Sequence, residues 1–354
     1  HEFNVLDGNY YLIGQNRLNR KPLLIYLNSE TGKHKQLPSV YGEESSFSDM
    51  LADPENGRLD VVLSESNGRV SRLQVKSFDA KGELIRNYFI LQQEDKSLLN
   101  AEITPGDTAQ KMLFGTYGTR DLRFTSGFFA KPVSASFGKG NFYSMLQLQN
   151  FFKFMKPRRE ERTRAREVKR LKTGKEPLYR YRVLLHDLIT TPNGYLLAGE
   201  AYYPQYRSST VTFPFETRQS FRQNTEGYKH THAVAMSFDK EGNLLWDNTF
   251  PLKDVMTNDL EHSVEVAQAR DGRVIMAYPK GDEIVYHIMQ EDRFDDKEYS
   301  FEIKTYHENE KIQVTENPGI VKWYDNHFIA FGYQRIKPSG TEPRSVFYLN
   351  KISF

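Results

Sequence analysis

No cysteine occurs among the 354 residues of this sequence. Disulfide bonds, thiol catalysis, iron–sulfur clusters and cysteine-bound zinc are therefore excluded. Apolar runs are short, since none approaches the ~18 residues that a membrane-spanning helix needs. The charge is nearly balanced, with 48 Lys and Arg against 46 Asp and Glu, so no global field attracts nucleic acid or a membrane.

Two scarce residue types bear on the setting and the fold. A long chain without cysteine fits a bacterial protein that leaves the reducing cytoplasm. We therefore expect a periplasmic or extracellular location, including attachment to the cell surface, and a leader removed ahead of His1. Tryptophan occurs only twice, but 24 Phe and 21 Tyr favour β-strands, because flat, stiff side chains suit a pleated surface.

One pattern recurs six times along the chain. It consists of an apolar strand, an Asn-Gly or Asp-Gly turn, a second apolar strand, a variable loop, an alternating strand, an Asp-x-x-Gly turn and a last strand. The clearest copy has its turns at 192–194 and 239–242. Asn-Gly and Asp-Gly supply the positive φ of tight hairpins, and Asp-x-x-Gly suits a turn closed by a left-handed glycine. Each copy is therefore expected to form a four-stranded antiparallel meander.

These meanders predict the fold class. Their inner strands are apolar at nearly every position, so both faces of each sheet must be covered. Sheets stacked around an axis achieve this cover and leave only short edges open. We therefore predict an all-β, six-bladed β-propeller of four-stranded blades in a single domain, 1–354. The sixth copy ends at 352–354 without a fourth strand, so either a strand at 2–6 or upstream of His1 closes the ring or that blade has three strands.

The hairpin at 237–246, Ser-Phe-Asp-Lys-Glu-Gly-Asn-Leu-Leu-Trp, and the similar segment at 27–33 resemble the repeat of quinoprotein-type propellers. They also resemble the Asp-box of sialidase-type propellers, with an Asp-to-Gly spacing one residue longer. The tryptophan appears in one copy only, and the copies number six where quinoproteins have eight. Taken whole, the chain is similar to secreted β-propellers of Bacteroidetes. This resemblance implies the fold and brings no catalytic residue with it.

A first insertion is expected at 141–178. Apolar residues at spacings of three and four predict an amphipathic helix over 142–155. A basic run follows, and 156–175 holds ten Lys and Arg against three Glu, a local charge of +7 that leaves −5 for the rest. The run either binds anionic lipid, an acidic polysaccharide or an acidic protein, or is a solvated helix with paired Arg and Glu. The candidate residues of this basic patch are Arg158, Arg159, Arg162, Arg166, Lys169 and Arg170.

A second insertion, at 202–231, is predicted to be an aromatic loop or hairpin. Aromatic rings beside arginines suit stacking on sugars or gripping a peptide, and the alternative is a hairpin whose rings pack on its own domain. His230 and His232 alternate on a strand and supply either two metal ligands or a hydrogen-bonded pair of surface histidines. The candidate binding residues are Tyr202, Tyr203, Tyr206, Arg207, Phe213, Phe215, Arg218, Arg222, His230 and His232.

Two His-carboxylate pairs, His186-Asp187 and Glu261-His262, are placed in first strands, which line a propeller's channel. They suit either acid/base chemistry or structural hydrogen bonding. No recognisable catalytic, nucleotide or metal motif occurs, so we expect no metal and no cofactor. The favoured function is an exported, non-enzymatic scaffold that binds a protein or glycan, with nucleic acid disfavoured. The alternative is a carbohydrate-active hydrolase or lyase with its site at the channel mouth.

Overall fold

The computed structural model describes residues 2–16, 18–19, 21–38, 44–107, 109–134, 138–177, 179–211, 220–295, 297–305, 307, 310–338 and 342–354. Contacts divide the chain into two compact units. Unit 1 comprises His1–Leu148, Arg162–Leu197 and Phe238–Leu245. Unit 2 comprises Gln149–Glu161, Ala198–Ser237 and Trp246–Phe354.

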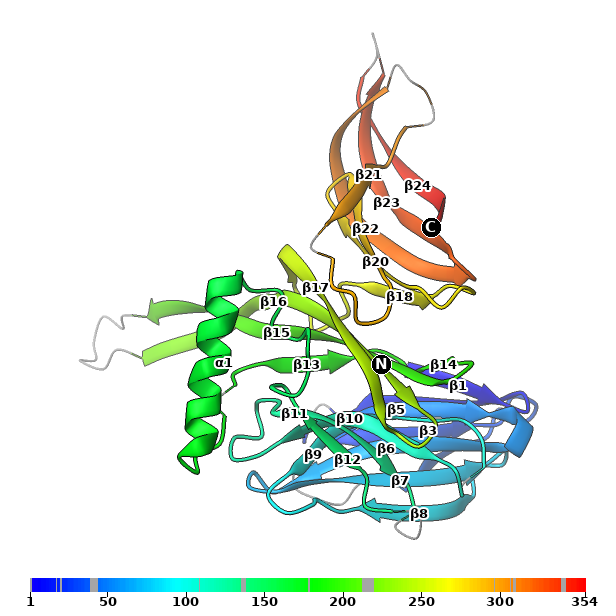
Figure 1. The fold of residues 1–354 in the computed structure, drawn as a ribbon. Helices are drawn as coiled ribbons and strands as arrows, with labels where there is room; N and C mark the ends of the chain where they lie inside the picture. The colour runs from blue at the N-terminus through cyan, green and yellow to red at the C-terminus, as the bar shows by residue number, and fades with distance from the viewer. Residues whose placement is uncertain are drawn as a thin grey trace. The chain divides into compact units, whose positions relative to one another are not determined.

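Unit 1 contains three four-stranded meanders (Figure 1). The first is β1 (Glu2–Leu6), β2 (Asn9–Gln15), β3 (Pro22–Leu27) and β4 (His34–Leu37). The second is β5 (Glu44–Asp53), β6 (Arg58–Ser66), β7 (Ser71–Asp79) and β8 (Leu84–Ile90), with the 3₁₀ turn Pro54–Asn56 between β5 and β6. The third is β9 (Ser97–Ile103), β10 (Met112–Gly118), β11 (Gly127–Pro132) and β12 (Asn141–Ser144).

The fourth sheet has strands with residues in both units. It consists of β13 (Arg182–Leu185), β15 (Gly194–Val211), β16 (Ser220–Asp239) and β17 (Leu244–Thr257), and β14 (Ile189–Thr191) pairs with β15. Unit 2 continues with β18 (Glu265–Gln268), β19 (Val274–Lys280), β20 (Glu283–Met289) and β21 (Tyr299–Glu302). The last sheet has three strands, β22 (Glu310–Tyr324), β23 (His327–Pro338) and β24 (Arg344–Ser353).

Successive sheets stack face to face within each unit. One core cluster joins β1–β4 to β5–β8, a second joins β5–β8 to β9–β12, and a third joins β18–β21 to β22–β24. First strands adjoin, since β1 contacts β5, β5 contacts β9, and β18 contacts β22. All seven residues of the middle strand β10 are buried, as predicted for sheets covered on both faces. The all-β prediction with six antiparallel sheets is confirmed, and this stacking is consistent with propeller blades.

The repeated turns dock each sheet on its predecessor. In the turn at 79–82, Gly82 has φ +73°, and its N–H donates to the hydroxyl of Tyr11 at 3.0 Å while that hydroxyl donates to the carbonyl of Asp79. The turn at 239–242 is also bound by a tyrosine, but through other backbone groups, because Tyr143 donates to the carbonyl of Gly242 at 2.9 Å and accepts from the N–H of Leu244 at 3.0 Å. A left-handed glycine and a tyrosine on the preceding sheet thus form a recurring joint.

A buried group of four charged side chains links the second and third sheets, and we name it the ion cluster. It consists of Asp53, Arg58, Asp60 and Lys111, all at most 8% exposed. The ammonium of Lys111 lies against the carboxylate of Asp60 and 3.8 Å from that of Asp53. The guanidinium of Arg58 lies 3.4 Å from Asp60 and 3.5 Å from Asp53. Two cations therefore balance two anions inside the core.

The helix is not where the apolar periodicity predicts it. Residues 145–155 form turns, and α1 is the basic run itself, Pro157–Lys172. The physical reason lies with Asp247, whose carboxylate accepts from the backbone N–H groups of Gln149 and Asn150 at 2.7 Å each, which takes donors that a helix would need. Met145, Leu148, Phe151 and Phe152 of this segment are nevertheless buried. Within the described ranges, no helix has the length and apolar character needed to cross a bilayer.

Candidate anion-binding groove

Three adjoining cavities of unit 1 form one groove. The first encloses about 660 Å³, the second about 410 Å³ and the third about 380 Å³. The third shares Arg120 and Arg123 with the first, and shares Arg170 and Arg180 with the second. Together with Arg166 these residues line what we name the arginine groove. Its lining holds five arginines and three carboxylates, so its net charge is positive.

The loop after β10 supplies one wall of the groove. Arg123 donates to both carboxylate oxygens of Asp121, at 2.9 Å and 2.7 Å. These hydrogen bonds hold the pKa of Asp121 below its usual value. Arg120 is 81% exposed at its side chain and lies 3.6 Å from the carboxylate of Glu176. The guanidinium of Arg120 therefore keeps most of its surface available to a ligand.

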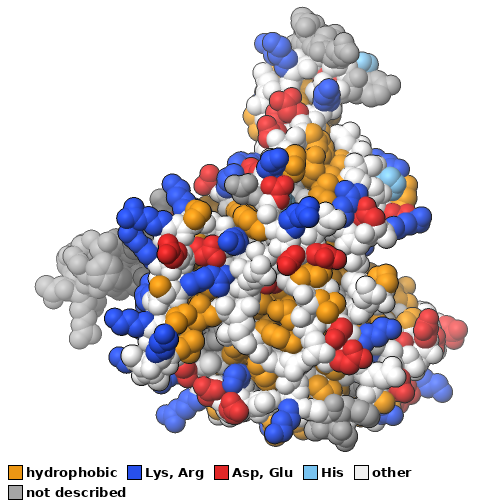
Figure 2. Space-filling view, in the orientation of Figure 1, with side chains coloured by type: hydrophobic (Ala, Val, Ile, Leu, Met, Phe, Trp, Pro, Cys, Tyr) orange, Lys and Arg blue, Asp and Glu red, His pale blue; other side chains and the backbone are white. Residues whose placement is uncertain are grey.

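The opposite wall comes from α1 and the segment after it. Glu167 is fully buried, and its carboxylate lies 2.7 Å from Arg166 and 3.6 Å from Arg170. Arg170 also donates to the carbonyl of Glu176 at 3.0 Å. The buried acid thus orients two arginines along the groove. Arg180 projects into solvent, and Figure 2 shows blue side chains gathered where Figure 1 draws α1.

Aromatic rings lie between the arginines. Tyr179 stacks on Tyr181 with ring centroids 6.5 Å apart, and burial raises the pKa of Tyr179. The guanidinium groups of Arg123 and Arg182 lie 5.6 Å and 5.8 Å from the ring centroid of Phe124. Both distances allow a cation–π interaction. Tyr179 is buried, whereas the half-buried rings of Phe124 and Tyr181 can meet the apolar face of a sugar while its acidic substituents meet the arginines.

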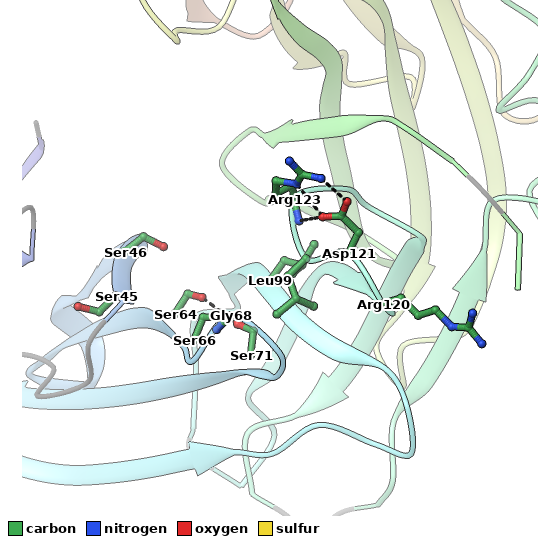
Figure 3. A pocket seen from close by; sticks show the side chains of 11 residues that line it. Ser45, Ser46, Ser64, Ser66, Gly68, Ser71, Leu99, Arg120, Asp121 and Arg123 are labelled. Carbon is green, nitrogen blue, oxygen red and sulfur yellow. Dashed lines mark hydrogen bonds and ion pairs between the residues drawn. The ribbon is translucent and has the colours of Figure 1, made fainter.

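Hydroxyl groups line the far end of the first cavity. Figure 3 shows serines of β5, β6 and β7 on one side and Arg123 paired with Asp121 on the other. Two of the hydroxyls, Ser64 and Ser71, lie 3.3 Å apart. Ser64 and Ser71 are buried, but the more exposed hydroxyls of Ser46 and Ser66 can both donate and accept hydrogen bonds, which suits a polyhydroxylated ligand. The serines are Ser45, Ser46, Ser64, Ser66 and Ser71.

The residues of the predicted basic patch lie on α1, and only part of the patch reaches the groove. Arg166 and Arg170 line the cavities, whereas Arg158, Arg159, Arg162 and Lys169 are exposed and line none of the three. The residues that sequence reasoning missed are Arg120, Arg123 and Arg180. They come from two segments about 60 positions apart, and no spacing in the sequence indicates that these segments meet.

The predicted aromatic insertion is a hairpin of β15 and β16. Tyr203 and Tyr206 are 41% and 52% exposed, while the ring of Tyr202 lies 5.9 Å from that of Tyr228. Phe213, Phe215 and Arg218 lie outside the described residues. Arg207 and Arg222 belong to β15 and β16, and their side chains lie outside the described part.

His230 and His232 are fully buried, so the prediction of a surface pair is wrong. His230 Nδ1 lies 2.7 Å from the carboxylate of Glu200, which also accepts from Ser263 and Val264. His232 stacks on Phe154 at 3.8 Å, and burial lowers its pKa to about 3. The two histidine rings considered as metal ligands are thus engaged in hydrogen bonding and ring stacking. Within the described ranges, no three His, Asp or Glu side chains form a metal-binding group.

The channel candidates do not lie within strands. His186 and Asp187 connect β13 to β14 in unit 1, and Glu261 and His262 precede β18 in unit 2 with exposed side chains. Of these four channel candidates, Asp187 also belongs to a larger group of carboxylates.

An acidic cluster forms around Asp187, and we define it as Glu2, Asp49, Glu102 and Asp187. Burial, followed by the charges of Asp49 and Asp187, raises the pKa of Glu2 to about 7. Burial also raises the pKa of Asp49 to about 7, against a hydrogen bond from the N–H of Ile103 at 2.8 Å. The pKa of Glu102 is raised as well, first by burial and then by Asp49. Sequence reasoning missed three members, although each lies on the first strand of its repeat.

No protein-family model matches the chain, and no curated protein matches it. Among solved structures, it is similar to the polysaccharide lyase Uly1, with a TM-score of 0.44 and 12% identity over 99% of this chain and 76% of that one. A mutant of the Synechocystis apocarotenoid oxygenase gives a TM-score of 0.41 and 9% identity over 99% and 74%. The β-propeller domain of Nup133 from Vanderwaltozyma polyspora gives 0.37 and 10% over 99% and 83%. The functional argument therefore rests on this chain's own residues.

Proposed function

We propose that this chain is an exported, non-enzymatic binding module whose arginine groove holds an acidic polysaccharide. The observation that carries the proposal is the continuous groove with five arginines, the half-buried rings of Phe124 and Tyr181, and serines at one end. Arginine forks match carboxylate and sulfate groups, the rings match sugar faces, and the serines match hydroxyls. A planar lipid surface would need no groove, and a duplex nucleic acid would not use the serines.

The groove can be tested with matched charge changes. Arg120→Gln with Arg180→Gln removes two exposed groove cations, and Arg158→Gln with Arg159→Gln removes two from the same chain outside it. Calorimetric titration with oligogalacturonate should show at least about tenfold weaker binding for the groove variant, with the control near the parent. Equal weakening in both variants, or equal binding of a neutral oligosaccharide, would contradict the proposal.

We further propose that the six sheets are blades of one closed ring. The first sheet exposes Phe3 and Leu12, and the last exposes Phe347 and Leu349, at 38–64% of their surface. Ring closure would cover both apolar faces. Because the chain lacks cysteine, Leu12→Cys with Leu349→Cys can be treated with a short bismaleimide and mapped by mass spectrometry. An intramolecular link is expected, whereas Val168→Cys with Leu349→Cys should give none; the reverse pattern would exclude closure.

The alternative of a carbohydrate-active hydrolase or lyase has one observation in its favour. The acidic cluster brings together carboxylates with raised pKa values, a property of general acids. Incubation with acidic and neutral polysaccharides, followed by assays for new reducing ends and for unsaturated products, distinguishes the two functions. A binding module releases neither product. Turnover that Asp49→Asn abolishes would replace the binding proposal with the enzymatic one.

The proposed location is the periplasm or the cell exterior. The absence of cysteine supports it, since exported bacterial proteins gain from the lack of stray thiols. Immunoblots of fractionated cells of the source bacterium should find the protein in the periplasmic, surface or medium fraction. Recovery in the cytoplasmic fraction alone would contradict an exported role.

A further inference from the structure

A further cavity of unit 1 adjoins the arginine groove, and we name it the side cavity. It encloses about 590 Å³ and shares Ser66 with the first cavity of the groove. Figure 3 shows Ser66 and Gly68 on the serine side of that first cavity. A ligand chain that lies in the groove can therefore continue past Ser66 into the side cavity. The other lining residues are Glu65, Asn67, Val70, Arg72, Leu91 and Gln92.

The charges in the side cavity are balanced, unlike those of the arginine groove. Arg72 donates through Nε to Oε2 of Glu65 at 2.8 Å, and a terminal guanidinium nitrogen lies 2.6 Å from the same oxygen. The guanidinium carbon of Arg72 also lies 4.6 Å from the ring centroid of Phe89. The cation of this lining is thus engaged by an anion and a ring, so the side cavity offers no excess positive charge to a carboxylate or a sulfate. A group that enters it from an acidic polysaccharide is therefore an uncharged one.

Two aliphatic side chains form an exposed apolar wall in the side cavity. Leu91 is 58% exposed and Val70 is 38% exposed. A methyl group that contacts this wall would remove apolar surface from water on both partners, which stabilises a complex. Sugar hydroxyls gain nothing from such a wall. The wall is therefore complementary to an apolar substituent of a sugar.

Amide groups beside the wall can donate hydrogen bonds. Oδ1 of Asn67 accepts from the N–H groups of Arg69 and Val70 at 3.0 Å and 2.8 Å. The amide nitrogen of Asn67 is thus the part that can donate to a ligand, and the exposed side chain of Gln92 brings a second amide nitrogen. Both nitrogens can donate to a carbonyl oxygen. A substituent with a methyl group and a carbonyl group fits these donors and the wall together.

Glu65 adds an acceptor to the same cavity. Both contacts with Arg72 fall on Oε2 of Glu65, so Oε1 can accept a further hydrogen bond. Its side chain is 14% exposed, which leaves it within reach of a bound group. An acetamido group has an N–H for this oxygen, whereas an acetyl ester has none and would leave Oε1 without a donor from the ligand.

We propose that the side cavity binds the acetamido group of an N-acetylated hexosamine, so that the polysaccharide in the groove contains both uronic acid and N-acetylhexosamine residues. The methyl group contacts Leu91 and Val70, and the N–H donates to Oε1 of Glu65. The carbonyl oxygen accepts from the amide nitrogens of Asn67 and Gln92. The uronate carboxylates meet the arginines. This inference rests on the proposed function and specifies its ligand.

The test compares two acidic oligosaccharides of equal length by calorimetric titration. Hyaluronan hexasaccharide alternates glucuronate with N-acetylglucosamine, whereas oligogalacturonate has no acetamido group. Leu91→Ser should weaken binding of the hyaluronan hexasaccharide at least about fourfold, the factor expected for one buried methyl group. It should change binding of oligogalacturonate by less than about twofold. The matched control is Leu84→Ser, since Leu84 is 41% exposed on β8 and lines none of these cavities.

The outcomes separate this inference from the proposed function. If neither oligosaccharide binds the parent chain, the proposed function itself is wrong. If oligogalacturonate binds and hyaluronan does not, or if Leu91→Ser weakens hyaluronan no more than Leu84→Ser does, the acetamido site is overturned and the arginine groove is not. O-acetylated oligogalacturonate provides the last arm. If its binding depends on Leu91 as strongly as that of hyaluronan, the substituent is an acetyl ester and the assignment to an amino sugar is overturned.

Discussion

Within unit 1, the ion cluster and the acidic cluster have opposite effects on the pKa of an aspartate. In the ion cluster, burial alone would raise the pKa of Asp53, but hydrogen bonds from Asn56 and Gly106 and the charge of Lys111 outweigh it, so the pKa lies below its usual value. In the acidic cluster, burial and neighbouring carboxylates raise the pKa of Asp49 to about 7. The pKa of an aspartate is thus lowered in one place and raised in the other, according to whether cations and hydrogen-bond donors are supplied.

The largest effect is expected from unbalancing the ion cluster. Lys111→Met leaves the buried carboxylate of Asp60 with Arg58 as its remaining cation and should lower the free energy of unfolding by ~3–5 kcal/mol. Chemical denaturation followed by circular dichroism measures this change. The double variant Lys111→Met with Asp60→Asn should recover part of the loss, because it removes the unpaired charge. A loss under about 1 kcal/mol in the single variant would contradict the view that charge balance holds this core together.

A medium effect, with a defined pH dependence, is expected from the acidic cluster. Because the folded-state pKa of Asp49 is raised to about 7, the folded state binds its proton more tightly, and stability falls as the pH rises from about 4 to about 7. Asp49→Asn removes this penalty and should raise stability at pH 8 by roughly 1–3 kcal/mol, with little change at pH 4. Thermal unfolding across pH 4–8 tests it. A variant as pH-dependent as the parent would show that Glu2 and Glu102 carry the titration.

The ion cluster should show the opposite slope. The lowered pKa of Asp53 contributes stability above its unfolded pKa of ~3.9, and this contribution is lost as the pH falls through the folded value. Asp53→Asn should therefore reduce the loss of stability that occurs below about pH 4. The pH dependence of stability between pH 5 and 8 should stay unchanged. A change confined to the neutral limb would contradict this assignment.

The smallest effect is expected at an exposed pair. Arg123 and Asp121 make a two-point contact, but their side chains are 72% and 43% exposed. Arg123→Gln should therefore change stability by less than ~0.5 kcal/mol, while weakening oligogalacturonate binding. A stability loss comparable to that of Lys111→Met would erase the distinction between buried and exposed charge.

The repeat pattern predicted much of the fold because its signals are local. Asp79 and Gly82 determine their turn through their own backbone preferences, and Asp239 and Gly242 do the same, so the sequence alone indicates where strands pair. The helix was misplaced because a distant carboxylate, Asp247, takes the N–H groups of the apolar segment. Periodicity carries no information about a partner almost 100 residues away.

The site was less predictable for the same reason. Arg166 and Arg170 were recognised because they belong to a dense basic run. Arg120 and Arg180 lie outside that basic run. They share a groove because a β-bridge between Thr125 and Tyr181 brings their two segments together. Glu2, Asp49 and Glu102 each lie on the first strand of a repeat, but at different distances from the turn that follows, so an alignment of the repeats would not have matched them.

The buried face of α1 has a consequence for how firmly that element is held. Arg164 donates to the carbonyls of Leu146 and Leu148 at 3.3 Å and 3.1 Å, and the fully buried side chain on this face is that of Glu167 rather than of an aliphatic residue. Polar and charged contacts thus hold α1 in place, and little apolar surface is buried beneath it. The fraction of time for which α1 is detached should therefore depend more on ionic strength than on temperature.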